Sequence, residues 1–367
     1  MNADLLYQLA LTMVPQIGAV HARSLLNIFG NAANIFQAKR KTLEGIEGIG
    51  SIRATAIKKF DQFQRCETEL KFIDQYKITA LCISDAAYPK RLLHCYDAPS
   101  VLYYKGNASL NAEKIIAIIG TRNNSEYGRH FCEKFIEELI PKDVLIVSGL
   151  ALGIDTIAHK NALRNQFSTV GVLAHGLDRI YPFSNKALAK QMVEQGGLLT
   201  EFISETNPDK QNFPRRNRIV AGMCDALVVV ETGKSGGSLI TAELANGYNK
   251  DVFAVPGRTT DTKSEGCNYL IKNNKAALIN DAQDFLELMN WAPAAAAKKQ
   301  LQRQLFVEFT ADEERILALL KTKPSVHIDD IYLQSNLSSS AVASALLTLE
   351  MQGIIHALPG KLYEAVG

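Results

Sequence analysis

The chain has 367 residues, 47% of them hydrophobic, and a formal net charge of only +2. This hydrophobic content excludes a largely disordered chain and is sufficient for two or three folded domains. The small net charge excludes a protein coated with basic residues, although it allows a local basic groove.

The cysteines and the N-terminus narrow the class of protein further. The six cysteines contain no CxxC pair, which argues against a disulfide framework and against a zinc site. The first residues contain no basic segment followed by a long apolar core, and no run reaches about 18 apolar residues. We therefore expect a cytoplasmic protein with no metal and no cofactor.

Residues 1–80 are expected to form a helical domain that opens with an internal repeat. The segments VPQIGAVHARSL (14–25) and IEGIGSIRATAI (46–57) align, with a glycine and an alanine at matching positions. Each copy is typical of a helix end, a tight turn and the start of a second helix. Such units resemble helix-hairpin-helix (SAM-like) domains, which can hold a DNA phosphate with backbone N–H groups. A bundle that only packs is the alternative, because neither hairpin is strongly basic.

Residues 81–290 alternate between apolar, β-branched runs and helical patterns. This order predicts a mostly parallel, doubly wound, extended Rossmann-like α/β domain with helices on both faces. The expected strands are 114–120, 144–149, 169–174, 226–231 and 251–257, and the clearest helices are 128–140 and 238–248.

The last part of the chain differs in composition. Residues 291–308 are Ala-rich and then basic, which is typical of a linker. Residues 309–367 predict three helices followed by a hairpin, the layout of a winged helix, with Ser338–Ser340 as the N-cap region of the third helix. That helix exposes mostly Ser, Ala and Thr with Glu350 near its end, so contact with a protein and weak contact with DNA both stay open.

Ligands of doubly wound sheets bind at the carboxyl ends of the strands. The loop after the first strand carries Gly120, Thr121 and Arg122. The glycine permits close approach of the backbone, and the guanidinium suits a phosphate. A salt-bridged surface arginine is the alternative.

Two further loops carry polar groups. Asp155 and His159 lie four residues apart on one helical face, which indicates a hydrogen-bonded pair that braces the fold more than a metal-binding or acid–base pair. Ser148 lacks the surroundings of a nucleophile. Lys186 begins a helix after the loop HGLDRIYPFSN, where a solvated lysine is the alternative reading.

The loop after residue 231 reads ETGKSGGS and leads into a helix. Such a run can form a nest of N–H groups that takes a phosphate. It lacks the spacing of a Walker loop, and no GxGxxG fingerprint occurs, so nucleotide-cofactor binding is poorly supported.

The segment PDKQNFPRRNR, expected to be a loop, combines cations with an aromatic ring. Lys210 and Phe213 stand beside three arginines, and this combination suits a nucleic-acid strand because cations hold phosphates while a ring stacks on a base. We expect at least one of the arginines to hold the segment in place, through a carboxylate such as Glu231 or Asp225.

Seven motifs between residues 88 and 280 resemble, in this order, those of the DNA-processing protein A family (DprA, also called Smf). They are GTR…YG, SGLALGID..AH..AL, GLDRIYP..N, FPRRNRIVAG, SGGSLITAELA, VFAVPG and S.GCNYLI. The ordered set is specific, although any one motif would be weak evidence.

The resemblance implies an extended Rossmann fold that binds single-stranded DNA without catalysis. It implies homodimers that protect DNA entering during natural transformation and help load the RecA recombinase for recombination, with a dimer interface that we expect within residues 265–290. By motif position, the strand-binding residues are Arg122, Lys210 and Phe213. The other expected contacts line the same pocket: Gly120, Thr121, Lys186, Arg215, Arg216, Asn217, Arg218, Lys234, Ser235, Gly236, Gly237 and Ser238.

Two other classes of function compete with DNA binding. GGSLITAE is faintly similar to the loop of nucleotide-cleaving phosphoribohydrolases, in which case Glu243 would be the catalytic carboxylate. The GT dipeptide of that loop is replaced here by Ser238-Leu239, which counts against an enzyme. A regulatory adaptor that binds its partner through the winged helix is the third class.

Overall fold

The computed structural model describes residues 3–139, 143–292, 309–321, 325–352, 354–358 and 361–365. The chain divides into two compact units, Met1–Pro293 and Ala294–Gly367. Apart from its first two residues, the expected linker 291–308 lies outside the described residues. The boundary expected at residue 80 stays a prediction, since both flanking segments belong to the first unit.

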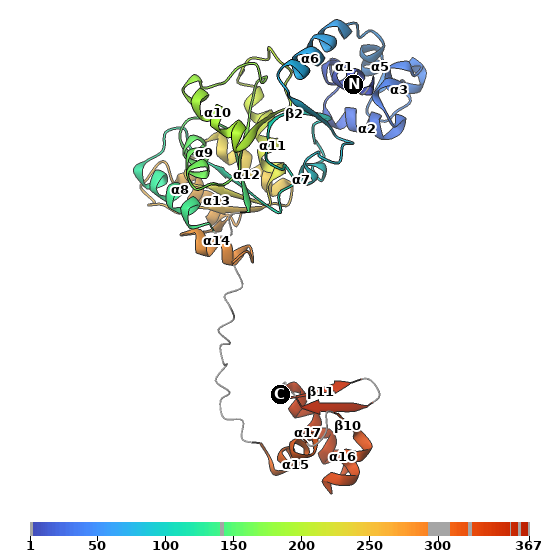
Figure 1. Ribbon diagram of the computed structural model, residues 1–367, viewed down its shortest axis with the longest axis vertical. Coiled ribbons are helices and arrows are strands. Elements are labelled where there is room, and N and C mark those ends of the chain that lie inside the picture. Colours follow the sequence, from blue (N-terminus) through green and yellow to red (C-terminus); the bar gives the residue numbers. More distant parts are fainter. Residues whose placement is uncertain are drawn as a thin grey trace. The chain divides into compact units, whose positions relative to one another are not determined.

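The first unit begins with helices that gather at one end of it (Figure 1). They are α1 (Ala3–Met13), α2 (Ala19–Phe29), α3 (Ala32–Gln37), α4 (Arg40–Glu44), α5 (Gly50–Lys58) and α6 (Phe63–Gln75). The repeat is confirmed as two helix–turn–helix units, α1–α2 and α4–α5. Corresponding residues of the two copies, Ile17 and Ile49, are buried in one apolar cluster, so the repeat builds this core.

The rest of the described first unit is built on a nine-stranded sheet, in the order β1-β2-β6-β5-β4-β3-β7-β8-β9. Its strands are β1 (Thr79–Cys82), β2 (Val101–Gly106), β3 (Lys114–Ile119), β4 (Val144–Ser148), β5 (Thr169–Val172), β6 (Gly196–Thr200), β7 (Ala226–Val229), β8 (Asp251–Ala254) and β9 (Ala277–Leu278). The five expected strands are confirmed and pair in parallel. The antiparallel strands β1 and β2 were not predicted, and neither were β6 and β9.

Helices cover both faces of the sheet, as predicted from its apolar strands. Successive residues of β3 alternate between two cores: Ile115 belongs to one and Ile116 to the other. The helices of this part are α7 (Lys90–Leu93), α8 (Glu126–Glu138), α9 (Ile154–Arg164), η1 (Phe183–Asn185), α10 (Lys186–Glu194), α11 (Asn212–Met223), α12 (Gly237–Gly247), α13 (Glu265–Lys272) and α14 (Ala282–Leu288). Helices α7, α11, α12 and α13 pack on the first core, and α8, α9 and α14 on the second.

The second unit has a core of its own, and its described part combines three helices with a three-stranded sheet in the order β10-β12-β11. The elements are α15 (Ala311–Leu320), β10 (Val326–His327), α16 (Ile328–Ser335), α17 (Ser339–Met351), β11 (Ile355–Leu358) and β12 (Leu362–Ala365). The three helices and the hairpin are as predicted. Ser338 caps α17, accepting a hydrogen bond from the Ala341 N–H.

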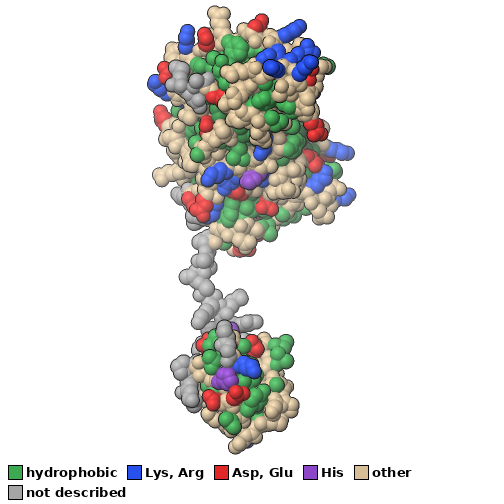
Figure 2. Space-filling view, turned by 90° about the vertical axis from the view of Figure 1, so that its right-hand side faces the viewer, with side chains coloured by type: hydrophobic (Ala, Val, Ile, Leu, Met, Phe, Trp, Pro, Cys, Tyr) green, Lys and Arg blue, Asp and Glu red, His purple; other side chains and the backbone are tan. Residues whose placement is uncertain are grey.

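Over the described part of the chain, no helix is long and apolar enough to cross a membrane. On the face of the first unit shown in Figure 2, Lys and Arg side chains are interspersed with Asp and Glu. This mixture agrees with the small net charge, so a site for an anion must depend on local geometry.

Candidate nucleic-acid interface

A cavity of about 580 Å³ lies beyond the carboxyl ends of β3, β4 and β7. Strand β4 pairs with one side of β3, and β7, which comes later in the chain, pairs with the other side of β3. This is the topological switch point at which doubly wound sheets bind ligands. Three loops and the start of α11 surround the cavity.

The loop after β3 is held firmly and presents Arg122. The Thr121 N–H donates to the Glu231 carbonyl at 2.7 Å, and the Thr121 carbonyl accepts from the Ile154 N–H at 3.2 Å. Gly120 is required here, because a Cβ would press into the Ile154 side chain. Arg122 forms no ion pair with any described carboxylate; its guanidinium lies 5.1 Å from the ring centre of Phe213. Its charge is therefore available to a ligand.

The segment expected to be a loop is the first part of helix α11, which begins at Asn212. Pro214 falls in the first turn, where its missing N–H would have no partner in any case. The helix continues because Ile219, Val220 and Met223 pack on the sheet. Because successive side chains of a helix point in different directions, the cations of this segment do not all face the same cavity. Phe213, Arg216 and Asn217 line the cavity.

Arg216 is buried and serves the structure. Its guanidinium donates to the carbonyls of Gly149 and Val172. Burial lowers the pKa of Arg216 to about 10, while the nearby Asp155 carboxylate opposes this change. Burial likewise raises the pKa of Asp155, with Arg216 opposing. The prediction that one arginine of the cluster holds the site in place is confirmed.

Arg215 and Arg218 lie on a different side of α11, so the prediction that all three arginines line one pocket is wrong. Arg218 donates to Glu201 at 2.5 Å and to the Asp97 carbonyl. Glu201 is thus the bracing carboxylate, and not Glu231 or Asp225 as expected. Asp225 instead pairs with Arg91 at 2.5 Å, and Glu231 accepts from the Ser125 N–H at 2.9 Å.

The glycine-rich loop after β7 contributes backbone to the cavity. Gly233, Gly236, Gly237 and Ser238 line it, whereas the exposed Lys234 and Ser235 do not. Helix α12 starts at Gly237, and its N-cap residue, Gly236, has no side chain to satisfy the first N–H groups. This end of the helix favours an anion.

The two predicted lysines are placed differently. Lys210 lines the cavity and is exposed. Lys186 lines neither this cavity nor the smaller one beside it; its ammonium lies 5.4 Å from the ring centre of Phe183.

Tyr181, in the loop HGLDRIYPFSN, is a neighbour of the site that was not among the predicted contacts. Its ring centre lies 6.2 Å from that of Phe213, and both rings line a small adjoining cavity of about 40 Å³. An exposed aromatic residue in a loop after a strand is the signal that could have identified it.

The expected hydrogen-bonded pair of Asp155 and His159 is not formed. The Thr169 hydroxyl donates to the Ile146 carbonyl at 3.0 Å, so its oxygen accepts from His159 Nδ1–H at 2.7 Å, and Asp155 accepts from the Ala151 N–H at 3.2 Å. Burial lowers the pKa of His159 to about 3, with Arg216 adding to the effect. The Ser148 hydroxyl donates to the Ile118 carbonyl at 2.6 Å and is buried, so it has a structural role.

The described residues that line the cavity form neither a metal site nor the catalytic site of the alternative enzyme. Among the described residues, no set of three or more His, Cys, Asp and Glu could hold a metal ion. Glu243 does not line the cavity; it pairs with Lys275 at 2.6 Å on the surface of the unit.

Comparison with known proteins identifies the family. The family described as DNA recombination-mediator protein A matches residues 79–290, more than half of the chain. The chain belongs to this family. The DprA winged helix domain matches residues 281–361, which confirms the predicted nature of the second unit.

Relatives in the family extend over the chain. Protein Smf of Synechocystis is 30% identical, with 99% of each chain covered. The X-ray structure of DNA processing protein A from Streptococcus pneumoniae is 33% identical, with a TM-score of 0.66, and covers 78% of this chain and 98% of its own. The Helicobacter pylori protein, whose structure concerns a single-stranded DNA binding mode, is 31% identical with a TM-score of 0.53, covering 58% of this chain and 96% of its own.

Proposed function

We propose that this chain is a non-catalytic protein that binds single-stranded DNA at the cavity beyond β3, β4 and β7. The observation that carries the proposal is the Arg122 guanidinium, which forms no ion pair with a described carboxylate and lies against the ring of Phe213, with Lys210 lining the same cavity. A cation holds a phosphate while an aromatic face stacks on a base, and this combination is typical of single-strand binders. The Helicobacter pylori relative is described as binding single-stranded DNA, which supports the proposal.

Within this site the predicted residues have different proposed roles. Arg122, Lys210 and Phe213 contact the strand. Gly120 and Thr121 allow its approach, and the backbone of Gly236, Gly237 and Ser238 holds a phosphate at the start of α12. Asn217 faces the same cavity, and Arg216 and Arg218 position α11. Lys186, Lys234 and Ser235 lie outside the cavity lining, and we propose for them only contacts with more distant parts of a strand.

Membership in the family supports a role in natural transformation and recombination, in the cytoplasm, with protection of incoming DNA and loading of RecA. We also propose a homodimer through residues 265–290. This segment exposes Tyr269, Leu278 and Leu288 by 45%, 42% and 55%, and β9 lies at an edge of the sheet. Exposed apolar side chains near an open sheet edge favour association.

The enzymatic alternative requires Glu243 to face a bound ribose. Its ion pair with Lys275 and its position outside the cavity lining argue against that role. Release of a free base from nucleoside monophosphates by the purified protein would overturn the non-catalytic proposal.

The test is a salt titration of the affinity for single-stranded and duplex DNA. We expect a preference for the single strand and a steep salt dependence, because phosphate contacts release counterions. The double variant Arg122→Ala with Lys210→Ala should bind weakly at every salt concentration, whereas Lys134→Ala, an exposed lysine of α8 that lines neither cavity, should bind as the parent does. Equal affinity of the double variant and the parent would refute the proposed site.

A further inference from the structure

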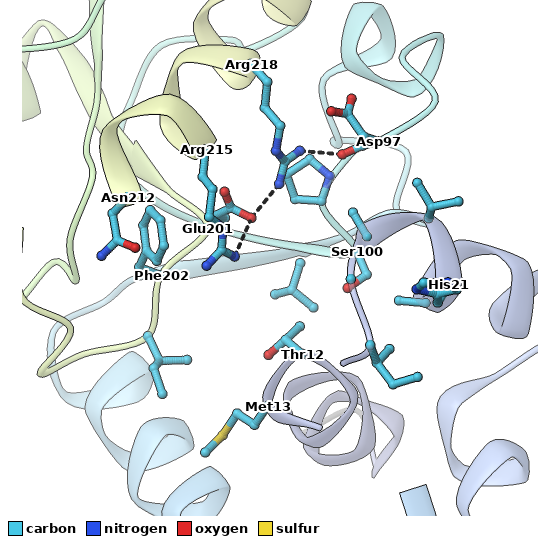
Figure 3. A pocket seen from close by; sticks show the side chains of 18 of the residues that line it. Thr12, Met13, His21, Asp97, Ser100, Glu201, Phe202, Asn212, Arg215 and Arg218 are labelled. Carbon is cyan, nitrogen blue, oxygen red and sulfur yellow. Dashed lines mark hydrogen bonds and ion pairs between the residues drawn. The ribbon is translucent and has the colours of Figure 1, made fainter. Parts of the chain in front are cut away.

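A second and larger cavity, of about 910 Å³, lies between the N-terminal helices and the α/β part of the first unit. The turn between α1 and α2 forms one wall, and the residues after β6 and the start of α11 form the other (Figure 3). We call this cavity the hairpin cleft. Of the seven family motifs, FPRRNRIVAG contributes Arg215 and Arg218 to this cleft, and the wall formed by the turn between α1 and α2 lies outside all of them.

Helix α11 separates the hairpin cleft from the proposed DNA site. Phe213, Arg216 and Asn217 face the DNA site, whereas Asn212, Arg215 and Arg218 line the cleft. The two cavities approach each other at the start of this helix, because Lys210 lines the DNA site and its neighbour Gln211 lines the cleft. A chain that passes over the first turn of α11 therefore reaches both.

One cation in the cleft is not committed to the structure. Arg218 holds Glu201 at 2.5 Å, and both side chains are almost buried. Arg215 is 58% exposed, lies 3.6 Å from the same carboxylate oxygen, and rests over the ring of Phe202. Figure 3 shows both arginines directed at Glu201. Since Arg218 already neutralises Glu201, and exposed ion pairs are weak, Arg215 can exchange Glu201 for a phosphate.

The wall formed by the hairpin adds a second feature suited to an anion. Helix α2 has 11 residues and begins after Gly18, which has no side chain to cap it. Gly18, Ala19 and Val20 all line the cleft, so the positive end of the helix is at this wall. Asp209 also lines the cleft and would repel an anion placed next to it.

An unsatisfied acceptor belongs to a residue that lines the cleft. Glu201 lines the cleft, its side chain is 8% exposed, and its Oε1 is buried without a hydrogen-bond partner among the described residues. A buried acceptor of this kind is costly unless a donor completes it. Nucleic-acid bases carry such donors, for example the N3–H of thymine.

We propose that the hairpin cleft holds the continuation of the DNA strand that is bound at Arg122 and Phe213. Its backbone phosphates contact Arg215 on one wall and the N-terminus of α2 on the other. The inference rests on the proposed function, and it gives the N-terminal helix–turn–helix unit a part in DNA binding.

The experiment uses the full chain, two lengths of DNA and three variants. Oligothymidylates of about 6 and about 16 nucleotides span the range of site sizes known for single-strand binding modules. Arg215→Ala removes the cation. Gly18→Asp places a carboxylate at the start of α2 while capping the helix. Gly18→Ala is its matched control, because a Cβ at Gly18 meets nothing within 4 Å.

We expect the long oligonucleotide to bind more tightly than the short one, and both Arg215→Ala and Gly18→Asp to remove most of that gain. For the long oligonucleotide, Arg215→Ala should reduce the slope of log affinity against log salt by about 0.7, the loss of one phosphate contact. Gly18→Ala should behave as the parent, and all three variants should bind the short oligonucleotide normally.

The inference fails if the long oligonucleotide shows no gain, if the variants keep it, or if they weaken both lengths equally. Failure of the proposed function is a separate result: Arg122→Ala with Lys210→Ala would then leave the short oligonucleotide bound as tightly as in the parent.

Discussion

The guanidinium of Arg122 lies 5.1 Å from the ring centre of Phe213, although the two residues come from the end of β3 and the start of α11. Arg122 forms no ion pair with a described residue that would hold its guanidinium at this position. The contact places a free positive charge beside a partly exposed ring, so that a phosphate and a base of one strand can be bound together.

Replacement of either partner should weaken single-strand binding, and the two effects should be coupled. Phe213→Ala is expected to cost about 1–3 kcal/mol of binding free energy through lost stacking, and Phe213→Tyr much less. Because the ring also positions the guanidinium, the double variant Arg122→Ala with Phe213→Ala should lose less than the sum of the single losses. Fluorescence anisotropy with a labelled oligothymidylate measures all four affinities. Strictly additive losses would show that the contact does not position Arg122.

Neighbouring arginines of α11 should differ sharply in their effect on stability. Arg216→Ala leaves Asp155 buried beside no cation and removes hydrogen bonds to two buried carbonyls, and we expect a loss of about 3–5 kcal/mol in the free energy of unfolding. Arg215→Ala, the matched control on the exposed side, should change it by less than about 0.5 kcal/mol. Urea unfolding followed by circular dichroism gives both values. Similar values for the two variants would contradict the structural role of Arg216.

His159 should make the protein less stable in mild acid. Its folded-state pKa is about 3, below the ordinary value of 6.5, so between these values the unfolded chain binds a proton that the folded chain does not. The free energy of unfolding should therefore fall as the pH is lowered through this window, by at most about 1.4 kcal/mol per pH unit. The raised pKa of Asp155 acts in the opposite sense.

The variant His159→Asn keeps a donor for Thr169 and has no titration in this window. Its stability should fall less steeply between pH 6.5 and pH 4 than that of the parent, measured by urea unfolding at each pH. Slopes are compared, not absolute stabilities, since the smaller side chain also alters packing. Parallel slopes would assign the acid sensitivity to other groups.

Two glycines of the site should respond differently to the same methyl group. A Cβ at Gly149 would collide with the guanidinium of Arg216, whereas a Cβ at Gly237 meets nothing within 4 Å. We expect Gly149→Ala to lower both the melting temperature and the affinity for single-stranded DNA, because Arg216 must move. Gly237→Ala should leave the melting temperature nearly unchanged. Equal behaviour of the two variants in a thermal melt would count against the close packing at Gly149.

Much of the fold follows from local patterns. The apolar runs of β3, β4 and β7 predict a parallel sheet because strands buried on both faces need apolar residues at every position. The antiparallel strands β1 and β2 were missed, although Val101–Tyr104 are buried, because a single short apolar run does not distinguish a strand from a buried helix segment.

The segment FPRRNR illustrates where local reading failed. It was expected to be a loop, yet it begins a helix, because a proline in the first turn costs no hydrogen bond and the apolar residues that follow pack on the sheet. A helix turns by about 100° per residue. Arg215 and Arg216 consequently point to different cavities, whereas in the sequence they form one cluster.

The sequence by itself determined the fold class, the repeat, the winged helix and the set of loops from which the site is built, because these depend on the periodicity and spacing of nearby residues. Only the tertiary structure decided which cation is free. Arg122, Arg216 and Arg218 are alike as residues, but the carbonyls of Gly149 and Val172 hold Arg216, and Glu201 holds Arg218. Electrostatic partners act through space and not along the chain, so the roles of these arginines depend on the packing of α11 against the sheet.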